Sequence, residues 1–489
     1  MTQDDGRHRC TRRGFLVASG MTTGALTASM ARAAAVGDGP MKRGTKEGAH
    51  VRAAFLYPPS TVFSEKPDGW WSWPGNEFDA EARQASYAAR LREVEADLGM
   101  RIVVEPKPIG AEGDARAFAE DLGADTPDGL LLVMFYNNSL PHADIILAAA
   151  EALHIPAVFY IGLGVKHGGV TQYRRPGLYF IQALDDLGAI RAGMRMINTK
   201  KLLSQSRVLS ISEHEPGEAV EPFLGVTVAK VPFSRYAAAF DEVQLGPESM
   251  AFIAGLKQRA SEIRGVTDEA FASAARAHFA LKRLLDEEQA DGLTMNCLRR
   301  GMLKPCISFA TLNGELVPAA CENDLPALYT QLLGQLLTGR PGFQHNPCYE
   351  TERNHYYASH CTCATKAYGP DGHDLPFLLR RFAHTNEGSC AIQVFWNAGD
   401  PVTMARYYPG EEPALDVYSG EVVVSHPMPP AGGCTTNVEI ALADRSDACM
   451  VTGHHNLLFC GDYARRFRQF ARLYRMRLAD TGFEGSWPA

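Results

Sequence analysis

The 489-residue sequence lacks the clustered basic residues and the long apolar segments that mark two common classes of protein. Its net charge is −8, and its lysines and arginines are scattered along the chain. Nucleic-acid binders carry a concentrated positive patch, so we expect no nucleic-acid partner. The apolar stretch near the N-terminus is short and interrupted by Gly and Thr, and no other segment approaches a membrane span. We therefore expect no stable membrane anchor.

Cysteine pairs with the spacing of a zinc knuckle are also missing. Ten of the eleven cysteines lie between Cys297 and Cys460, but the pair Cys361-Thr-Cys363 is too tight, and no second close pair follows it. The spacing therefore predicts no zinc site. The full glycine spacing of a dinucleotide-binding loop is absent as well, so a nucleotide is not supported.

The first 50 residues have the composition of a targeting segment followed by a linker. Arg12 and Arg13 precede an apolar run that starts at Phe15, and small residues fit for cleavage follow up to residue 35. This order resembles a twin-arginine export signal and predicts a periplasmic or extracellular location. Residues 36–50 are polar and rich in Gly and Lys, as a linker is.

From residue 51 to about residue 347, short apolar strands alternate with helical stretches. In the first half the expected strands cover residues 51–58, 101–109, 128–136 and 155–164, and the expected helices cover 77–99 and 142–154. Strict alternation of this kind predicts parallel sheets wrapped by helices. Short strands with Gly, Pro and Asp between them follow, which predicts an antiparallel β-domain closed by a helix over 463–476. The expected domains are 51–205, 206–347 and 348–489.

A candidate ligand crevice lies at the carboxyl ends of strands in the first domain. Parallel sheets bind ligands at that edge, which draws attention to residues 136–142 and 162–169. Asn137 is the polar side chain that we predict to contact a substrate there.

Two acids, Glu322 and Asp324, stand directly before a leucine-rich stretch. Leucines at helical spacing begin at Leu325, and Gly339 lies where such a helix should stop. Asp324 is placed to cap this helix, a contribution of about 1 kcal/mol. A cap needs only one acceptor, so the second acid leaves an alternative open: a metal ligand beside a carboxylate that transfers protons.

Three histidines complete the candidate site. His454 and His455 lie between two apolar runs, and His360 ends another. Neighbouring residues of an extended segment face opposite sides, so at most one of His454 and His455 should enter a given site. A single histidine is more often a surface or hydrogen-bonded core residue. Together with Asp324, however, these three suit a hard divalent ion held by carboxylate and imidazole.

Four stretches resemble the L-fucose and L-arabinose isomerase superfamily: residues 318–343, 355–361, 391–409 and 452–476. The resemblance is specific over about residues 290–475. It implies an α/β fold with two Rossmann-like domains followed by an antiparallel β-barrel-like C-terminal domain, usually in a homo-oligomer. It also implies a divalent metal, commonly manganese (Mn²⁺), that binds an open-chain sugar while acids move a proton between C1 and C2 through an enediol.

Within this resemblance, Asp324 matches the metal-binding Asp of the superfamily. His455, or failing that His454, matches its C-terminal His ligand. His360 matches the His of its His-Cys motif, and we predict that His360 contacts the substrate.

One position departs from the superfamily. A Glu that is both metal ligand and acid/base normally stands about two dozen residues before Asp324, whereas the corresponding stretch here, "MNCLRRGM", carries Arg300. A guanidinium cannot bind a cation and stays protonated. No acid occurs from Gly292 to Lys304, so Glu322 or another acid has to replace the missing carboxylate.

Three functions remain open from the sequence. The first is a metal-dependent aldose–ketose isomerase. The second is an exported glycoside hydrolase in which Arg300 grips a charged sugar group and two carboxylates cleave the bond. Its candidate acids are Glu322, Asp324, Glu350 and Glu352. The third is a non-catalytic sugar-binding protein, in which Trp71 of the cluster Trp70-Trp71-Trp73 stacks on a sugar ring, although such clusters more often serve packing.

Overall fold

The computed structural model describes residues 45–64, 77–299, 304–382, 388–427, 434–445 and 447–478. The expected export signal over residues 1–35, Arg300 and Trp71 lie outside these ranges, so the predictions made for them stay predictions. Across the ranges described, no helix combines the length and the apolar composition needed to cross a membrane.

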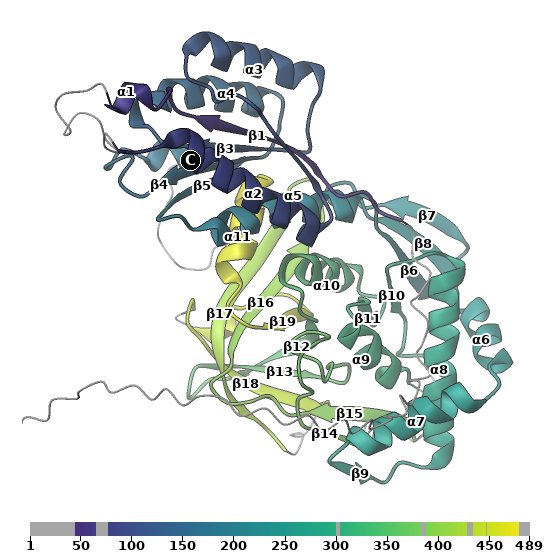
Figure 1. Cartoon of the computed structure of the whole chain (residues 1–489). Coiled ribbons are helices and arrows are strands. Elements are labelled where there is room, and N and C mark those ends of the chain that lie inside the picture. Colours follow the sequence, from purple (N-terminus) through teal and green to yellow (C-terminus); the bar gives the residue numbers. More distant parts are fainter. Residues whose placement is uncertain are drawn as a thin grey trace, which may run out of the picture. The chain divides into compact units, whose positions relative to one another are not determined.

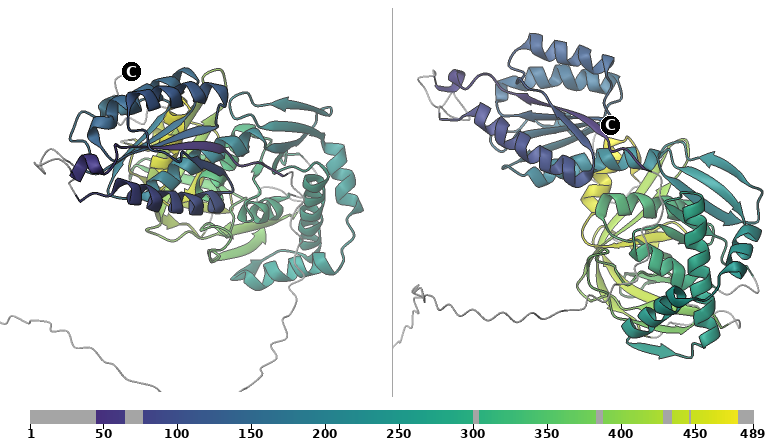
Figure 2. Two further views of the ribbon diagram at one scale, coloured as in Figure 1. Left: turned by 45° about the horizontal axis from the view of Figure 1, so that its top comes forward. Right: turned by 45° about the vertical axis from the view of Figure 1, so that its right-hand side comes forward.

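The first half of the chain forms a five-stranded parallel sheet in the order β2-β1-β3-β4-β5. Its strands are β1 (His50–Leu56), β2 (Arg101–Val104), β3 (Gly129–Met134), β4 (Ala157–Gly162) and β5 (Leu178–Ala183). Helices α2 (Ala80–Leu98) and α5 (Leu187–Ser204) cover one face, and α3 (Glu112–Ala124) and α4 (Leu140–Ala152) cover the other (Figures 1 and 2). Side chains of β1 alternate between the two resulting cores, with Phe55 in one and Leu56 in the other.

A second five-stranded sheet follows in the order β11-β10-β6-β8-β7, parallel except for the edge strand β7. Its strands are β6 (Arg207–Ser212), β7 (Gly217–Val220), β8 (Thr227–Pro232), β10 (Gly292–Met295) and β11 (Ala319–Cys321). One face packs against α6 (Phe233–Glu242), α8 (Asp268–Glu287) and α9 (Cys306–Gly314), and the other against α10 (Leu325–Thr338). The predicted parallel-sheet architecture is therefore confirmed.

The C-terminal region contains a closed six-stranded antiparallel barrel. Around the barrel the strands are β16 (Pro401–Tyr408), β19 (Asn456–Cys460), β12 (Phe343–Glu350), β13 (His355–His360), β18 (Thr436–Leu442) and β17 (Ala414–Ser425). Pairing of β16 with both β17 and β19 closes the ring, which leaves no exposed strand edge. The predicted antiparallel barrel is thus confirmed.

The remaining elements surround these three sheets. A three-stranded sheet joins β9 (Glu262–Arg264), β14 (Phe377–Arg381) and β15 (Cys390–Val394). The strand β20 (Arg477–Leu478) pairs with β17, and α11 (Ala464–Leu473) packs beside it. Helix α7 (Pro247–Arg259) packs against α8, and the short elements are α1 (Thr61–Ser64), η1 (Asn137–Ser139), η2 (Thr171–Tyr173) and η3 (Ala448–Met450).

Strand pairing crosses the domain limits expected from the sequence. The limit at residue 347 falls inside β12, and β9 pairs with β14 although β9 belongs to the expected second domain. Residues 45–50, expected to be linker, pack against the fold: Ala49 is fully buried, and the Lys46 ammonium lies 2.7 Å from the Asp291 carboxylate. Such partners lie far along the chain, where local composition carries no signal for them.

Helix α10 connects the second sheet to the barrel. It contacts β10 and β11 on one side and β16 and β19 on the other. Gly334 permits this approach, because a Cβ atom at that position would overlap the ring of Phe459 on β19. Helix α10 is thereby packed closely against β19, the strand that directly follows His455.

Candidate metal centre

The acids Glu322 and Asp324 lie at the carboxyl end of β11, in the tight turn that leads into α10. Asp324 caps the helix as predicted, with its Oδ1 accepting a 2.8 Å hydrogen bond from the backbone N–H of Ala327. Glu322 and Asn323 both adopt the left-handed conformation, with φ of 64° and 54°. For Glu322 this conformation costs about 1–3 kcal/mol, whereas Asn adopts it more readily. The turn therefore holds Glu322 in a conformation that the surrounding contacts must stabilise.

The histidines His360 and His455 are brought together by the register of β12. His360 ends β13, and His455 immediately precedes β19; these two strands flank β12 on either side. Ser359 pairs with Asn346, and Asn456 pairs with the adjacent His345. The imidazole rings of His360 and His455 consequently lie with their centroids 5.3 Å apart.

Glu322 lies between these imidazoles. Its Oε1 is 3.6 Å from Nε2 of His360, and its Oε2 is 3.6 Å from Nε2 of His455. The ligand atoms of Glu322, His360 and His455 all lie within 4.8 Å of one another. Both histidines are buried, and Glu322 is partly exposed. One carboxylate and two imidazoles therefore converge on one point that solvent can reach from the glutamate side.

A second contact orients His455. Its Nδ1 lies 2.8 Å from Oδ2 of Asp324, which is also 3.5 Å from the guanidinium of Arg406. Arg406 donates in addition to the backbone carbonyl of His455. Because a carboxylate accepts hydrogen bonds, the proton of the neutral ring resides on Nδ1, and the Nε2 lone pair faces Glu322. Asp324 is thus the partner of a candidate ligand, with both of its oxygens already in use.

The pKa shifts of Glu322 and Asp324 indicate that the surroundings favour the ionised form of both carboxylates. His360 lowers the pKa of Glu322 against the opposing effect of burial. Burial alone raises the pKa of Asp324, but the hydrogen bond from His455 and the charge of Arg406 outweigh it and leave the pKa below its usual value.

The imidazole of His360 responds in the opposite direction. Burial disfavours its protonated form, yet Glu322 and Cys321 outweigh burial and raise its pKa to about 9. Glu322 and Cys321 therefore favour a positive charge beside them, which the proton on His360 supplies. A bound cation would supply the same positive charge in place of that proton.

The residues present fit a divalent metal ion. Among the residues that the structure describes, Nε2 of His360 and Nε2 of His455 are buried without a hydrogen-bond partner. At 3.6 Å their distances to Glu322 exceed a hydrogen bond. Neighbouring ligands on one ion lie about 3.0–3.4 Å apart when each bond is about 2.1 Å, so only a small adjustment is needed. The chain thus has a buried group of Cys, His and Glu residues that can hold a metal ion.

His454 also approaches this group, which differs from the sequence expectation. Its side chain is 70% exposed, but its Nε2 lies 3.6 Å from Oε2 of Glu322. The prediction that at most one of the two histidines enters the site assumed an extended segment. Residues 454 and 455 instead form a bend, and β19 begins only at Asn456. Strand alternation therefore does not apply to this pair.

Asn137 lies at a different place, in η1 after β3 of the first sheet. Its Oδ1 is buried and, in the part of the chain that the structure describes, has no hydrogen-bond partner. Phe135, Gly162 and Leu163 from the same sheet edge line a pocket of about 230 Å³. A hollow therefore exists at the predicted sheet edge, in a sheet separate from the one that carries Glu322.

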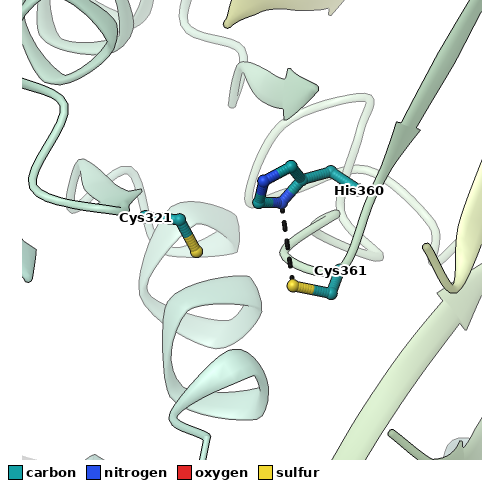
Figure 3. Close-up of side chains that lie close together, drawn as sticks. All are labelled: Cys321, His360 and Cys361. Carbon is teal, nitrogen blue, oxygen red and sulfur yellow. Dashed lines mark hydrogen bonds between the residues drawn. The ribbon is translucent and has the colours of Figure 1, made fainter. Parts of the chain in front are cut away.

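Two cysteines also border this group, although the spacing of cysteines along the sequence did not predict them there. Cys321 directly precedes Glu322, Cys361 directly follows His360, and both thiols lie within 4.8 Å of a ligand nitrogen of His360 (Figure 3). The expectation of no zinc site considered only cysteines that are close in sequence. The His-Cys motif at residues 360–361 was the one available signal.

When the sequence is compared with models of known protein families, none matches, and a comparison with curated proteins also finds no match. The resemblance to the isomerase superfamily therefore stays a prediction.

Proposed function

We propose that this protein is a metal-dependent sugar isomerase, in which Glu322, His360 and His455 hold a divalent ion and Asp324 orients His455. The observation that carries the proposal is the convergence of one carboxylate and two unpartnered imidazole nitrogens within 4.8 Å. When bound, the ion supplies Lewis acidity that favours negative charge on a substrate carbonyl oxygen. The sugar substrate itself rests on the resemblance over residues 290–475.

Glu322 has a defined part in this proposal. The superfamily's usual acid is replaced by Arg300, which cannot bind a cation. Glu322 lies between the two imidazoles and supplies a carboxylate at this site. The position of Glu322 therefore supports a metal site in spite of the replacement by Arg300.

His454 is the group that we propose moves the substrate proton. Its imidazole is exposed at the entrance to the group and lies within 3.6 Å of Glu322, where a bound sugar can reach it. Imidazole is the most frequent general acid or base in enzymes. The oxygens of Asp324 are occupied by Ala327 and His455, so Asp324 is less suited to this role.

Manganese is the ion that we propose, following the superfamily. A site with two imidazoles and one carboxylate also accepts Zn²⁺ or Fe²⁺, because imidazole suits these ions well. Elemental analysis of the purified protein distinguishes among them.

Glycoside hydrolysis has less support. A glycosidase needs one carboxyl group with a raised pKa to protonate the leaving oxygen, whereas the pKa values of Glu322 and Asp324 are both lowered. Glu350 pairs with His355, at the opposite end of β13 from His360. From His355 to His360 there are five steps of about 3.4 Å along the strand, so Glu350 lies about 17 Å from His360. Glu350 therefore has no place in this group.

The test compares wild type with Glu322→Gln and with Glu350→Gln as a matched control. Each protein is freed of metal by chelation, reloaded with Mn²⁺, and supplied with a panel of free aldoses and of aryl glycosides. We expect ketose formation only after reloading, its loss in Glu322→Gln, and wild-type behaviour in Glu350→Gln. Aldose turnover by protein shown to be metal-free would refute the proposal, as would turnover of the glycosides alone.

The broader expectations are proposals of the same kind. We propose that the two α/β halves are Rossmann-like, that the protein is exported by the twin-arginine route, and that it assembles as a homo-oligomer. The β2-β1-β3-β4-β5 order of the first sheet is one of the orders found in doubly wound folds and supports the first of these.

A further inference from the structure

A second group of metal-ligating side chains borders the first and has a different chemical character. Cys321, His360 and Cys361 offer one ligand atom each, and these atoms all lie within 4.8 Å of one another. Figure 3 shows the two sulfur atoms and the imidazole turned toward a common point, from the ends of β11 and β13. Exposed fractions are 1%, 1% and 6% for Cys321, His360 and Cys361, so the group is closed to solvent.

A third thiol, that of Cys306, lies beside Cys361 but outside this group of three. Cys306 is the first residue of α9, is buried, and places its Sγ 3.4 Å from Sγ of Cys361. The Sγ of Cys361 is in turn 3.7 Å from Nδ1 of His360. Around a tetrahedral zinc ion, the usual bond lengths separate two sulfurs by about 3.8 Å and a sulfur from a nitrogen by about 3.6 Å. Both measured distances lie within a few tenths of an ångström of these values.

We propose that Cys321, Cys361 and Nδ1 of His360 form a second metal site, selective for a thiophilic divalent ion such as Zn²⁺. The neighbouring thiol of Cys306 completes the site when the ion draws it toward the other three ligands. Thiolates are soft ligands that hard ions such as Mn²⁺ and Mg²⁺ avoid, and three of them with one imidazole form a common structural zinc set. The site differs from the Glu322 site in ligand chemistry, in burial and in the ring nitrogen of His360 that it uses.

The contacts of the thiols with one another and with His360 distinguish them from cysteines that only fill a core. Isolated buried cysteines behave as small apolar residues. Here the Sγ of Cys361 lies 3.4 Å from the Sγ of Cys306 and 3.7 Å from Nδ1 of His360, so these thiols meet polar groups at close range. Cys363 provides the contrast: it is two residues from Cys361 and also buried, but its sulfur accepts a hydrogen bond from the indole of Trp396 and donates to the backbone carbonyl of Ala364.

His360 connects the two sites because it presents Nδ1 to the thiols and Nε2 to Glu322. An imidazole that loses both ring protons can ligate two ions at once. Occupation of the thiolate site therefore alters the charge and the proton position of a ligand of the first site, without any contact with substrate.

The test uses the full chain, reduced and freed of metal, and titrated with Co²⁺ as an optical substitute for Zn²⁺. We expect a sulfur-to-cobalt charge-transfer band in the near ultraviolet that Zn²⁺ abolishes at one equivalent. Cys361→Ser and Cys306→Ser should lose most of the band, whereas the matched control Cys363→Ser should retain it. Glu322→Gln should also keep the band while it lowers the total ions bound per chain from two to one.

Failure of this site is distinguishable from failure of the proposed function, because only the thiolate site produces the band and only the Glu322 site supports turnover. Reduced wild-type protein without the band would overturn the proposal, as would equal bands in Cys361→Ser and Cys363→Ser. If the serine variants do not fold, X-ray absorption of zinc-loaded wild type decides. Three sulfur neighbours support the site, and none or one refutes it.

Discussion

Replacing Asp324 with Asn separates the two tasks that this side chain performs. Oδ1 accepts from Ala327 at the helix start, and Oδ2 accepts from Nδ1 of His455, each at 2.8 Å. Asn caps a helix about as well as Asp does. If its oxygen keeps the cap, however, its NH₂ group faces the N–H of His455, and two donors oppose each other. The ring then has to move its proton to Nε2, the atom that faces Glu322.

The magnitude follows from the altered tautomer. An imidazole whose Nε2 carries a proton cannot ligate through that atom, and loss of such an orienting partner typically weakens metal binding about 10–100-fold. This corresponds to about 1.4–2.8 kcal/mol. If the amide turns round to accept from His455 instead, the cap is lost, which lowers the free energy of unfolding by about 1 kcal/mol. Either orientation is therefore measurable.

The assay is calorimetric titration of metal-free protein with Mn²⁺, together with denaturant unfolding of the same samples. Asp79→Asn is the matched control, because Asp79 caps α2 by accepting from Ala82 at 2.8 Å, without a histidine partner. We expect the Kd to rise, or stability to fall, in Asp324→Asn alone. If both quantities matched those of the Asp79→Asn control, Asp324 would be a helix cap and nothing more.

Two further predictions concern stability. Gly334→Ala should lower the free energy of unfolding by about 1–3 kcal/mol, the usual cost of overpacking, because the new methyl group overlaps Phe459. Gly255→Ala in α7, where a Cβ meets open space, should instead raise it by up to about 1 kcal/mol, since Ala favours helix. Equal effects in denaturant unfolding would contradict the packing of α10 on the barrel. The buried carboxylate of Glu439 accepts from His355 at 2.7 Å, from His426 at 2.9 Å and from Arg353 at 3.1 Å. Burial alone raises the pKa of Glu439, but these donors outweigh burial and lower the pKa. At acid pH the unfolded chain therefore binds more protons than the folded chain does. The stabilisation is fully present above about pH 4.3, the unfolded value, and is lost as pH falls through the lower folded value. Glu439→Gln should cost about 1.5–3 kcal/mol at neutral pH, the range for hydrogen bonds to a charged group, and should flatten the acid side of the stability curve. An unchanged dependence on pH would show that these donors do not stabilise the carboxylate.

The sequence predicted secondary structure wherever this depends on residues that are close together along the chain. The α10 helix begins after Asp324 and ends at Gly339, whose φ is 69°, as capping chemistry and leucine spacing predict. The strands and helices expected between residues 51 and 164 overlap elements of the structure, and the expected antiparallel strands form the barrel, whereas α3, β5 and α5 were not predicted. These features depend on backbone preferences and side-chain periodicity over a few residues, and both can be recognised from a short stretch of sequence.

The site was decided by contacts that sequence spacing cannot express. Asp324 and His455 are 131 residues apart, and Cys306 and Cys361 are 55 residues apart. Their proximity follows from the register of β12 between β13 and β19 and from the packing of α10 against the barrel. Register and packing are set by the summed burial of many side chains, so no single motif encodes them. The sequence by itself determined which ligand types were available, and only the tertiary structure decided which of them meet.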